Sequence, residues 1–266
     1  MSSKKLSPKS FLNDFYKSKV KDYDYENITL FDVIDLNNKN SINDFIGENL
    51  DNLDITKLYD DLDGKINNLK LLLESTSACQ ISDALSDLSN NNGVIKTIKS
   101  INNQKAYGVV VTAETDSNDW GTSLIAIDKA KKGEILFIHA PGESSAIWGE
   151  LTSTSSKSKG ISGTVIVGAT RDIDFLINYD YPVFASSVVP NAGKAYAKGK
   201  INVPINIDGV NVLPGDFIFA DESGVVVIPK GIFKLVMRQL IDIKINEFNI
   251  ISEINKGKAI SEILNL

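Results

Sequence analysis

The sequence predicts an α/β fold built on a mixed β-sheet, and two patterns along the chain support this prediction. Between residues 108 and 170, short β-branched runs alternate with segments whose apolar residues recur at helical spacing. This alternation is typical of layered α/β domains. Residues 201–229 instead hold several β-branched runs separated by the turn signals IDGV, PGD and ESGV. Such turns predict β-hairpins, and hairpins add antiparallel strands to a sheet.

The composition is that of a globular protein and narrows the possible partners. The 266 residues are 42% hydrophobic and 23% charged, with a net charge of −6. The negative charge and the absence of a long run of Lys and Arg argue against a nucleic-acid partner. No stretch of 18 apolar residues and no secretory signal pattern occurs, so we expect no membrane partner and a cytoplasmic location.

The chain holds one cysteine and one histidine. A single Cys79 excludes an internal disulfide, and with the single His139 it excludes zinc sites made of Cys and His. Cys79 lies in an apolar helical stripe and is predicted to be a core thiol. His139 ends a predicted strand and could act as an acid or base. A hydrogen-bonded structural role is favoured, because no carboxylate lies at a suitable sequence spacing.

Residues 1–72 are rich in Asn, Asp, Lys and Leu and contain amphipathic segments, which predict a helical N-terminal extension. The extension either packs on the main domain or binds a partner. Packing is favoured, because amphipathic helices mostly cover a core. A further helix is expected over residues 76–85, with Ser75 or Thr76 as its cap. Asp83 either faces the site or is solvated or hydrogen-bonded structurally, and the latter is favoured.

Strands are expected where the chain reads GVVVTAET from Gly108 and EILFIHA, and a helix that ends at Gly133 is expected between them. A second helix is predicted over residues 149–160, followed by a short strand over residues 163–168 that is bounded by Gly168. The helix and the strand have similar lengths, about 16 Å and about 17 Å, since a residue advances about 1.5 Å in a helix and about 3.3 Å in a strand. If they pack antiparallel, the start of the helix lies beside the end of the strand.

That juxtaposition predicts a site. Free backbone amides in the first helical turn favour an anion such as a carboxylate. Arg171 offers a planar fork of donors for a carboxylate or a keto oxygen, and Asp172, helped by Glu150, offers hard oxygen ligands to Mg²⁺ or Mn²⁺. The predicted site residues are Gly149, Glu150, Leu151, Thr152, Arg171 and Asp172. A solvent-exposed cluster of ion pairs is the alternative, and spacing alone leaves both interpretations open.

After Asp172 the sequence predicts a short helix and the strand YPVFASS. The loop over residues 191–200 carries three lysines and is either a solvated turn or a rim that attracts an acidic substrate. Asp221 and Glu222 are expected to cap a hairpin rather than to complete the site of a neighbouring subunit. Residues 232–264 predict a long helix and a short one, interrupted at Gly257.

Several of these segments resemble one family. TSACQISDAL, GVVVTA, WGEL with GATRD, and the β-rich residues 201–229 are similar to segments of the RraA-like family, which is named for regulator of ribonuclease activity A and includes 4-hydroxy-4-methyl-2-oxoglutarate aldolases. The resemblance implies a layered, swivelling β/β/α-type domain over residues 73–230. Residues 1–72 would precede it, and residues 231–266 would form helices on the domain or at a subunit contact.

The aldolases of this family carry an acidic residue, twenty intervening residues and then Arg-Asp, and this chain matches with Glu150, Arg171 and Asp172. By resemblance, Asp172 ligates the metal with help from Glu150, Arg171 binds and polarises the substrate, and the amides of residues 149–152 hold the pyruvate-like carboxylate. Two positions depart from the pattern. Glu150 replaces an Asp and reaches about one methylene further, and Val167 occupies a position where the family often has Asp.

The resemblance implies a lyase that depends on Mg²⁺ or Mn²⁺ and cleaves a 4-hydroxy-2-oxo acid to pyruvate through an enolate, with oxaloacetate decarboxylation as a side activity. The alternative is a non-catalytic regulatory binding protein of the ribonuclease-inhibitor type, and a weaker one is a member that has lost its chemistry and uses residues 1–72 as an interaction module. The retained Glu150, Arg171 and Asp172 favour the enzyme. We further expect a homotrimer or hexamer with active sites at the subunit contacts.

Overall fold

The structure, a computed structural model, describes residues 65–89 and 91–266. The chain divides into two compact units. Of the described residues, the larger unit contains Thr76–Leu240, and the other contains residues 65–75 and Ile241–Leu266. Residues 1–64 are outside the described part, so the predicted helical extension is described only at its end, where α5 covers Lys65–Glu74.

The larger unit alternates strands and helices in its middle and then becomes β-rich. The elements after α5 are α6 (Ala78–Leu88), β1 (Val94–Ile95), β2 (Lys99–Ser100), β3 (Ala106–Glu114), α7 (Gly121–Lys129), β4 (Ile135–His139), β5 (Ala146–Trp148), α8 (Glu150–Lys159), β6 (Gly163–Thr170), α9 (Ile173–Asn178), β7 (Val183–Val188), β8 (Lys200–Ile201), β9 (Ile205–Ile207), β10 (Val210–Val212), β11 (Phe217–Asp221), β12 (Gly224–Ile228), the short 3₁₀ helix η2 (Lys230–Ile232), α10 (Phe233–Asn255) and α11 (Ile260–Ile263). This order confirms the predicted layered α/β fold with a mixed sheet.

One large sheet organises the unit, in the strand order β1-β12-β11-β3-β4-β6-β7-β2. The four central strands β3, β4, β6 and β7 are mutually parallel, as expected for strands joined through helices. The hairpin β11–β12 adds antiparallel strands beside β3. β1 and β2 occupy the two ends of the order, although only residues 96–98 separate them in sequence. Four residue steps span at most about 14 Å, so the sheet must curve round towards itself.

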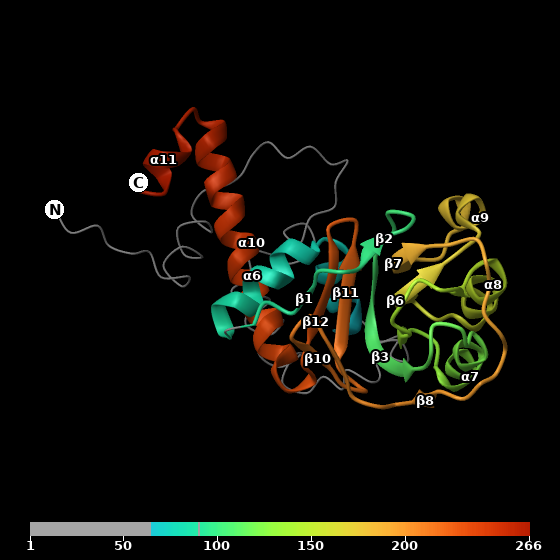
Figure 1. The fold of residues 1–266 in the computed structure, drawn as a ribbon. Coiled ribbons are helices and arrows are strands. Elements are labelled where there is room, and N and C mark those ends of the chain that lie inside the picture. Colours follow the sequence, from blue (N-terminus) through green and yellow to red (C-terminus); the bar gives the residue numbers. More distant parts are fainter. Residues whose placement is uncertain (1–64, 90) are drawn as a thin grey trace. The chain divides into compact units, whose positions relative to one another are not determined.

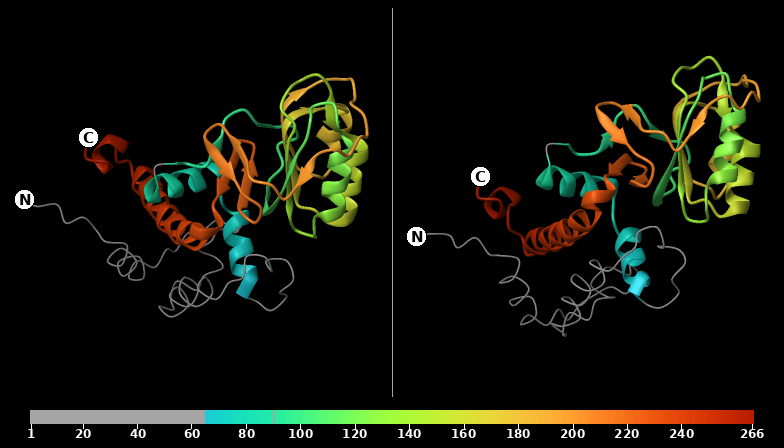
Figure 2. Two further views of the ribbon diagram at one scale, coloured as in Figure 1. Left: turned by 60° about the horizontal axis from the view of Figure 1, so that its bottom comes forward. Right: turned by 90° about the horizontal axis from the view of Figure 1, so that it is seen from below.

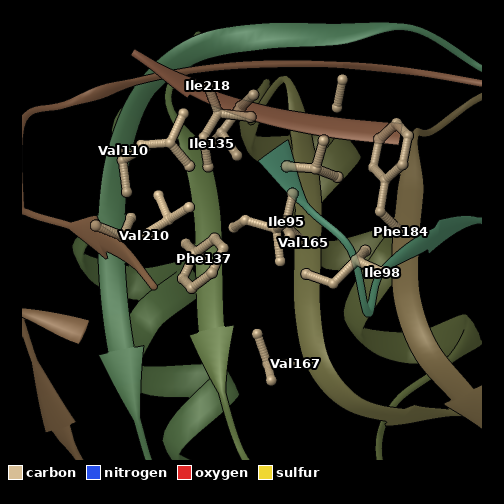
Figure 3. Close-up of a cluster of buried hydrophobic side chains, with 14 of the residues drawn as sticks. Ile95, Ile98, Val110, Ile135, Phe137, Val165, Val167, Phe184, Val210 and Ile218 are labelled. Carbon is tan, nitrogen blue, oxygen red and sulfur yellow. The ribbon is translucent and has the colours of Figure 1, made fainter. Parts of the chain in front are cut away.

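The curved sheet encloses an apolar core. Its members come from strands on all sides, including Val110 of β3, Phe137 of β4, Val165 of β6 and Ile218 of β11, and Figure 3 shows their side chains converging. The alternate residues of the parallel strands face a second cluster under the helices, which includes Leu136, Ile166, Ile127 of α7 and Leu176 of α9. The strands are thus buried on both faces, which explains their continuous β-branched runs.

Helices α7, α8 and α9 lie together on one face of the parallel strands (Figures 1 and 2). The buried residues of α8 are small and polar, Thr152, Ser153 and Ser156, so this helix lies close to the sheet. Trp148, at the end of β5, is buried beneath it, and its indole Nε1–H donates to Ser153 Oγ at 2.8 Å. α8 ends as predicted at Gly160, which adopts the left-handed conformation with φ +76°.

Three local predictions are wrong. The cap of α6 is Ser77, whose hydroxyl accepts from the Gln80 amide, and not Ser75 or Thr76. Cys79 is exposed and is not a core thiol, because the buried stripe of α6 follows Ala78, Ile81, Ala84 and Leu85 and leaves Cys79 to one side. β6 continues through Gly168 to Thr170 instead of ending at the glycine.

Other predictions are confirmed. Asp83 is exposed, and the hairpins β9–β10 and β11–β12 form where the turn signals lie. Asp221 does cap its hairpin, because its Oδ1 accepts from the Ser223 amide at 2.8 Å. The C-terminal region forms a long helix and a short one, with Gly257 between them at φ +91°. Within the described residues, no helix is long and apolar enough to cross a membrane.

Candidate active site

The candidate site forms where two neighbouring parallel strands end. β5 pairs with β6, and Trp148, the last residue of β5, is opposite Thr170, the last residue of β6. The Arg171 amide continues the pairing and donates to the Trp148 carbonyl at 3.1 Å. The residues after each strand, Gly149 and Arg171, are therefore neighbours. Ligands of α/β proteins bind preferentially at such carboxyl ends of parallel strands.

One backbone amide ties the first turn of α8 to the residues that follow β6, and another stabilises the turn itself. The Glu150 amide donates to Asp172 Oδ2 at 3.0 Å, and the Gly149 amide donates to Thr152 Oγ1 at 2.9 Å. The juxtaposition expected from the lengths of the two elements is thus present. By helix geometry the next two amides, of Leu151 and Thr152, have no intrahelical acceptor and can meet an anion. Of the four backbone amides predicted to bind an anion, only those of Leu151 and Thr152 are therefore available.

Position 149 requires glycine because side-chain atoms of Arg171 and Asp172 lie close to its Cα. Its φ of 176° is extended and open to any residue. A Cβ built at this position, however, would lie 2.4 Å from Asp172 Oδ2 and 3.1 Å from Arg171 Cγ. The absence of a side chain at Gly149 therefore lets the Asp172 carboxylate reach the start of α8.

Asp172 has an unusual backbone conformation. Its φ of 57° and ψ of 44° are left-handed, in a region that Asp tolerates better than most residues but that still costs about 1 kcal/mol. The Phe175 and Leu176 amides donate to the Asp172 carbonyl at 3.1 and 3.0 Å and so hold this conformation. Such local strain is typical of functional sites. Here it directs the carboxylate towards α8 rather than along α9.

Arg171 and Asp172 form a half-exposed pair. Arg171 Nε lies 3.5 Å from Asp172 Oδ2, and the two side chains are 38% and 35% exposed. The pair is solvated enough that it adds little to stability. Both groups remain accessible to a ligand.

These groups line one small cavity. Its volume is about 90 Å³. All six residues predicted from the sequence line it, together with five others: Trp120, Ala146, Ile147, Trp148 and Ala192. The structure therefore gathers Gly149, Glu150, Leu151, Thr152, Arg171 and Asp172 at one place, while their chemical roles stay a prediction.

Among the lining residues, Trp120 lies outside every segment that sequence reasoning connected with the site, and Ala192 belongs to a loop in which only the lysines were considered. Trp120 precedes α7, Ala146 and Ile147 belong to β5, and Ala192 lies in the long loop after β7. The rule that sites form at the carboxyl ends of parallel strands could have found the start of α7. No local pattern marks Ala192, because its approach to β5 depends on pairing between residues 46 positions apart along the chain.

The oxygen donors of the cavity suit a hard, largely hydrated cation. Asp172 Oδ2 already accepts from the Glu150 amide, which leaves Oδ1 and the Glu150 carboxylate as available oxygens. Mg²⁺ commonly binds one or two carboxylates and keeps several waters. Across the described residues, no group of three or more His, Cys, Asp or Glu side chains could hold a metal by itself. The donor set therefore fits Mg²⁺ or Mn²⁺ and does not fit a zinc site.

A second cavity, of about 400 Å³, lies near the carboxyl end of β3 and is lined by Glu114, Thr115, Asp116, Asp119, Tyr196, Lys198, Gly199 and Lys200. His139, for which a hydrogen-bonded structural role was expected, lies beside Glu114, one of the residues that line this cavity. His139 Nδ1 is buried without a hydrogen bond, and it lies 3.5 Å from Glu114 Oε1. This carboxylate belongs to the neighbouring strand β3, so its distance from His139 along the sequence gave no indication of the contact.

Comparison with known proteins is consistent with this arrangement. A family model described as RraA-like, Aldolase/RraA, matches residues 78–227, which include every residue of the cavity. An uncharacterised protein of Methanocaldococcus jannaschii is 39% identical over 170 residues, covering 62% of this chain and 81% of that protein. A protein of Halalkalibacterium halodurans named "Putative 4-hydroxy-4-methyl-2-oxoglutarate aldolase" is 39% identical over 153 residues, covering 57% of this chain and 71% of its own.

This chain is also similar to a solved structure. The RNA-processing inhibitor RraA of Thermus thermophilus superposes with a TM-score of 0.51 at 28% sequence identity. The superposition covers 56% of this chain and 92% of that one. Similarity thus extends both to a protein named as an aldolase and to a protein named as an inhibitor.

Proposed function

This chain belongs to the RraA-like family, and we propose that it is a divalent-metal-dependent aldolase. The substrate class is a 4-hydroxy-2-oxo acid similar to 4-hydroxy-4-methyl-2-oxoglutarate, and the product is pyruvate. The observation that carries the proposal is the gathering of Arg171, Asp172, Glu150 and the start of α8 around one small cavity. The fold alone would not support it, because one fold serves many functions.

The size of the cavity fits the part of the substrate that becomes pyruvate. Its volume of about 90 Å³ is several times the roughly 10–15 Å³ of such space that one water molecule needs. A three-carbon oxo acid fills such a space, while the remainder of a longer acid extends towards solvent. Trp120, Ile147 and Ala192 supply apolar walls that exclude water around the reacting carbons.

The polar groups are suited to hold the oxo acid. Arg171 presents a fork of N–H donors to the carboxylate or the keto oxygen, and the amides of Leu151 and Thr152 offer further donors at a helix N-terminus. Negative charge that develops on the keto oxygen is stabilised most by donors that are already in place. The bond between the Thr152 hydroxyl and the Gly149 amide keeps the first turn of α8 in this form.

Asp172 and Glu150 would hold a divalent cation. When bound, such a cation polarises the keto oxygen and lowers the pKa of nearby water. The short distance between Asp172 Oδ2 and the Glu150 amide, 3.0 Å, keeps the two acidic residues at one end of the cavity.

The cleavage balances without any further reactant. A base removes the proton of the C4 hydroxyl, the C3–C4 bond breaks as the C4 carbonyl forms, and the electron pair is delocalised into the pyruvate enolate, which then takes a proton at C3. None of the residues that line the cavity is a His or Lys. We therefore infer that a water molecule accepts the hydroxyl proton. Oxaloacetate loses CO₂ through the same enolate, so decarboxylation is expected as a side activity.

A non-catalytic binding protein is the second candidate, favoured by the similarity to the Thermus thermophilus inhibitor. The purified protein should be assayed for pyruvate release from 4-hydroxy-4-methyl-2-oxoglutarate and from oxaloacetate. Mg²⁺, Mn²⁺ and a chelator should each be tested. Release that requires the metal supports the aldolase, and the absence of release from both substrates with either metal favours the binding protein.

A further inference from the structure

Asp119 is a buried carboxylate that lies outside the small cavity of the candidate site and beside the second, larger cavity, and it accepts five hydrogen bonds. Its side chain is almost fully enclosed, with the residue 2% exposed. Oδ1 accepts from the amides of Gly121 at 3.0 Å and Ala197 at 2.8 Å. Oδ2 accepts from the Lys198 amide at 2.9 Å and from the hydroxyls of Thr115 at 2.9 Å and Thr122 at 2.8 Å. A carboxylate offers about four lone-pair positions, so Asp119 is saturated.

These bonds keep Asp119 ionised. Burial alone would raise its pKa, but the bonds from the amides of Lys198 and Ala197 and from the hydroxyls of Thr122 and Thr115 lower the pKa to about 2. Each bond is therefore made to a negative charge and is stronger than a bond between neutral groups. The donors come from three segments: the end of β3, the start of α7 and the loop over residues 189–199.

Two of these segments form walls of the small cavity. Trp120 directly follows Asp119, and Ala192 belongs to the bound loop. The loop is paired on both sides, since the Ala146 amide donates to the Asn191 carbonyl at 2.8 Å and the Lys194 amide donates to the Asn118 carbonyl at 2.7 Å. The approach is close, because a Cβ on Gly193 would lie 2.4 Å from the Asn118 carbonyl oxygen.

We propose that Asp119 is the positioning residue of this cavity: its ionised carboxylate fixes Trp120 and the loop with Ala192 relative to each other, and so sets the width of the cavity for the substrate. The kinetic part of this inference rests on the proposed function. Asp119 does not line the small cavity and is not a catalytic residue. Asp172 and Glu150 are held by a separate bond, from the Glu150 amide to Asp172 Oδ2, so metal affinity is not expected to depend on Asp119.

Asp119→Asn tests the proposal. It removes the charge and places an amide N–H₂ where a carboxylate oxygen accepts. A matched control is Asp216→Asn, because Asp216 is also buried, at 4% exposed, and accepts from the amides of Leu213 and Lys230 at 2.8 and 2.9 Å. Asp216 does not line the cavity.

The chain provides a direct readout of the cavity. It contains two tryptophans, Trp120 and Trp148, and both line the cavity. Quenching of tryptophan fluorescence by acrylamide therefore reports access to it without any need for turnover. We expect Asp119→Asn to raise the acrylamide quenching constant roughly twofold and KM for the oxo acid roughly tenfold. The value of kcat and the Mg²⁺ requirement should be nearly unchanged, because the substitution weakens binding of the substrate and of the transition state equally. Asp216→Asn should change neither quenching nor KM.

Two results would overturn the proposal. One is a folded Asp119→Asn protein with the quenching and KM of the wild type, and the other is an equal change in Asp216→Asn. If Asp119→Asn does not fold, Thr122→Val replaces it, since it removes one hydroxyl that donates to Asp119 and accepts from the Gly199 amide at 2.9 Å. If the wild type cleaves no oxo acid, the proposed function fails, and the quenching comparison still decides the role of Asp119.

Discussion

Glu150 is the residue at which the site departs from the aldolase pattern. It is exposed at the start of α8, and its amide, rather than its carboxylate, makes the bond to Asp172. The backbone link would survive any substitution other than proline. Changes at Glu150 therefore isolate the contribution of the carboxylate itself.

Glu150→Asp and Glu150→Ala should behave differently. The shorter acid keeps a charged oxygen near Asp172 and should change activity only modestly. Glu150→Ala removes one of the two oxygen donors and should raise the Mg²⁺ concentration needed for half-maximal activity by roughly tenfold or more. Metal titrations of pyruvate release measure this. Wild-type metal dependence in a folded Glu150→Ala protein would mean that the acidic group has no part in metal binding.

Gly149→Ala should disable the site while leaving the fold intact. The extended backbone admits alanine, but the new Cβ would displace the Asp172 carboxylate from its position 2.4 Å away. We expect a loss of activity of about 10²-fold, because a displacement of about 1 Å is enough to cause it. The control is Gly231→Ala, where a Cβ meets nothing within 4 Å. Equal activity in the two variants would show that this close approach is not needed.

At the scale of elements, sequence patterns predicted α8 and β6 because strong local signals bound them. Gly160 adopts the left-handed conformation that ends the helix, and Thr164 to Val167 is a buried β-branched run. The end of β6 was missed because Gly168, at φ +154°, lies within the strand, where a Cβ would be 2.5 Å from the Ala140 carbonyl oxygen. A glycine that allows close strand approach looks the same in sequence as one that ends a strand.

The cap of α6 and the role of Asp119 were also missed because they depend on contacts between residues far apart in the sequence. Three hydroxyl residues in a row, Ser75 to Ser77, could each cap α6, and Ser77 takes the role while Asp221 from a distant hairpin accepts from the Ala78 amide at 2.8 Å. Asp119 was not predicted at all. Two of its donors, Ala197 and Lys198, are 78 and 79 residues away along the chain.

Asp119 should make stability depend on pH. Its pKa is lowered from 3.8 to about 2 in the folded protein, so the stabilisation is fully present above pH 3.8 and is lost as the pH falls towards 2. A shift of this size corresponds to about 2 kcal/mol. Urea unfolding of wild type and Asp119→Asn at pH 6 and at pH 2.5 measures it. The difference in unfolding free energy between the two proteins should shrink at the lower pH, and a constant difference would contradict the assignment.

At the scale of the whole molecule, assembly is expected to complete the surface around the cavity. Leu151 lines the cavity and is 73% exposed, and Ile177 of α9 and Val188 of β7 are 54% and 52% exposed. Closed symmetric assembly commonly buries apolar side chains of this kind. We expect a homotrimer or a dimer of trimers, with a mass three or six times that of the chain by light scattering. A monomer mass at micromolar concentration would contradict this.

In the proposed function, the carboxylate of Asp172 supports metal-dependent cleavage of an oxo acid in this cavity. Asp172→Asn isolates its charge, because Asn also tolerates the left-handed backbone at this position. Asp174→Asn, two residues further on in the first turn of α9 and exposed, is the matched control.

The most direct measurement is pyruvate release from 4-hydroxy-4-methyl-2-oxoglutarate by the wild type, Asp172→Asn and Asp174→Asn across a Mg²⁺ titration. We expect release by the wild type to stop with chelator and Asp174→Asn to match the wild type. Asp172→Asn should be slower by about 10²-fold or more, with partial recovery at high Mg²⁺. Equal rates in Asp172→Asn and the wild type, or release that persists with chelator, would contradict the proposed function.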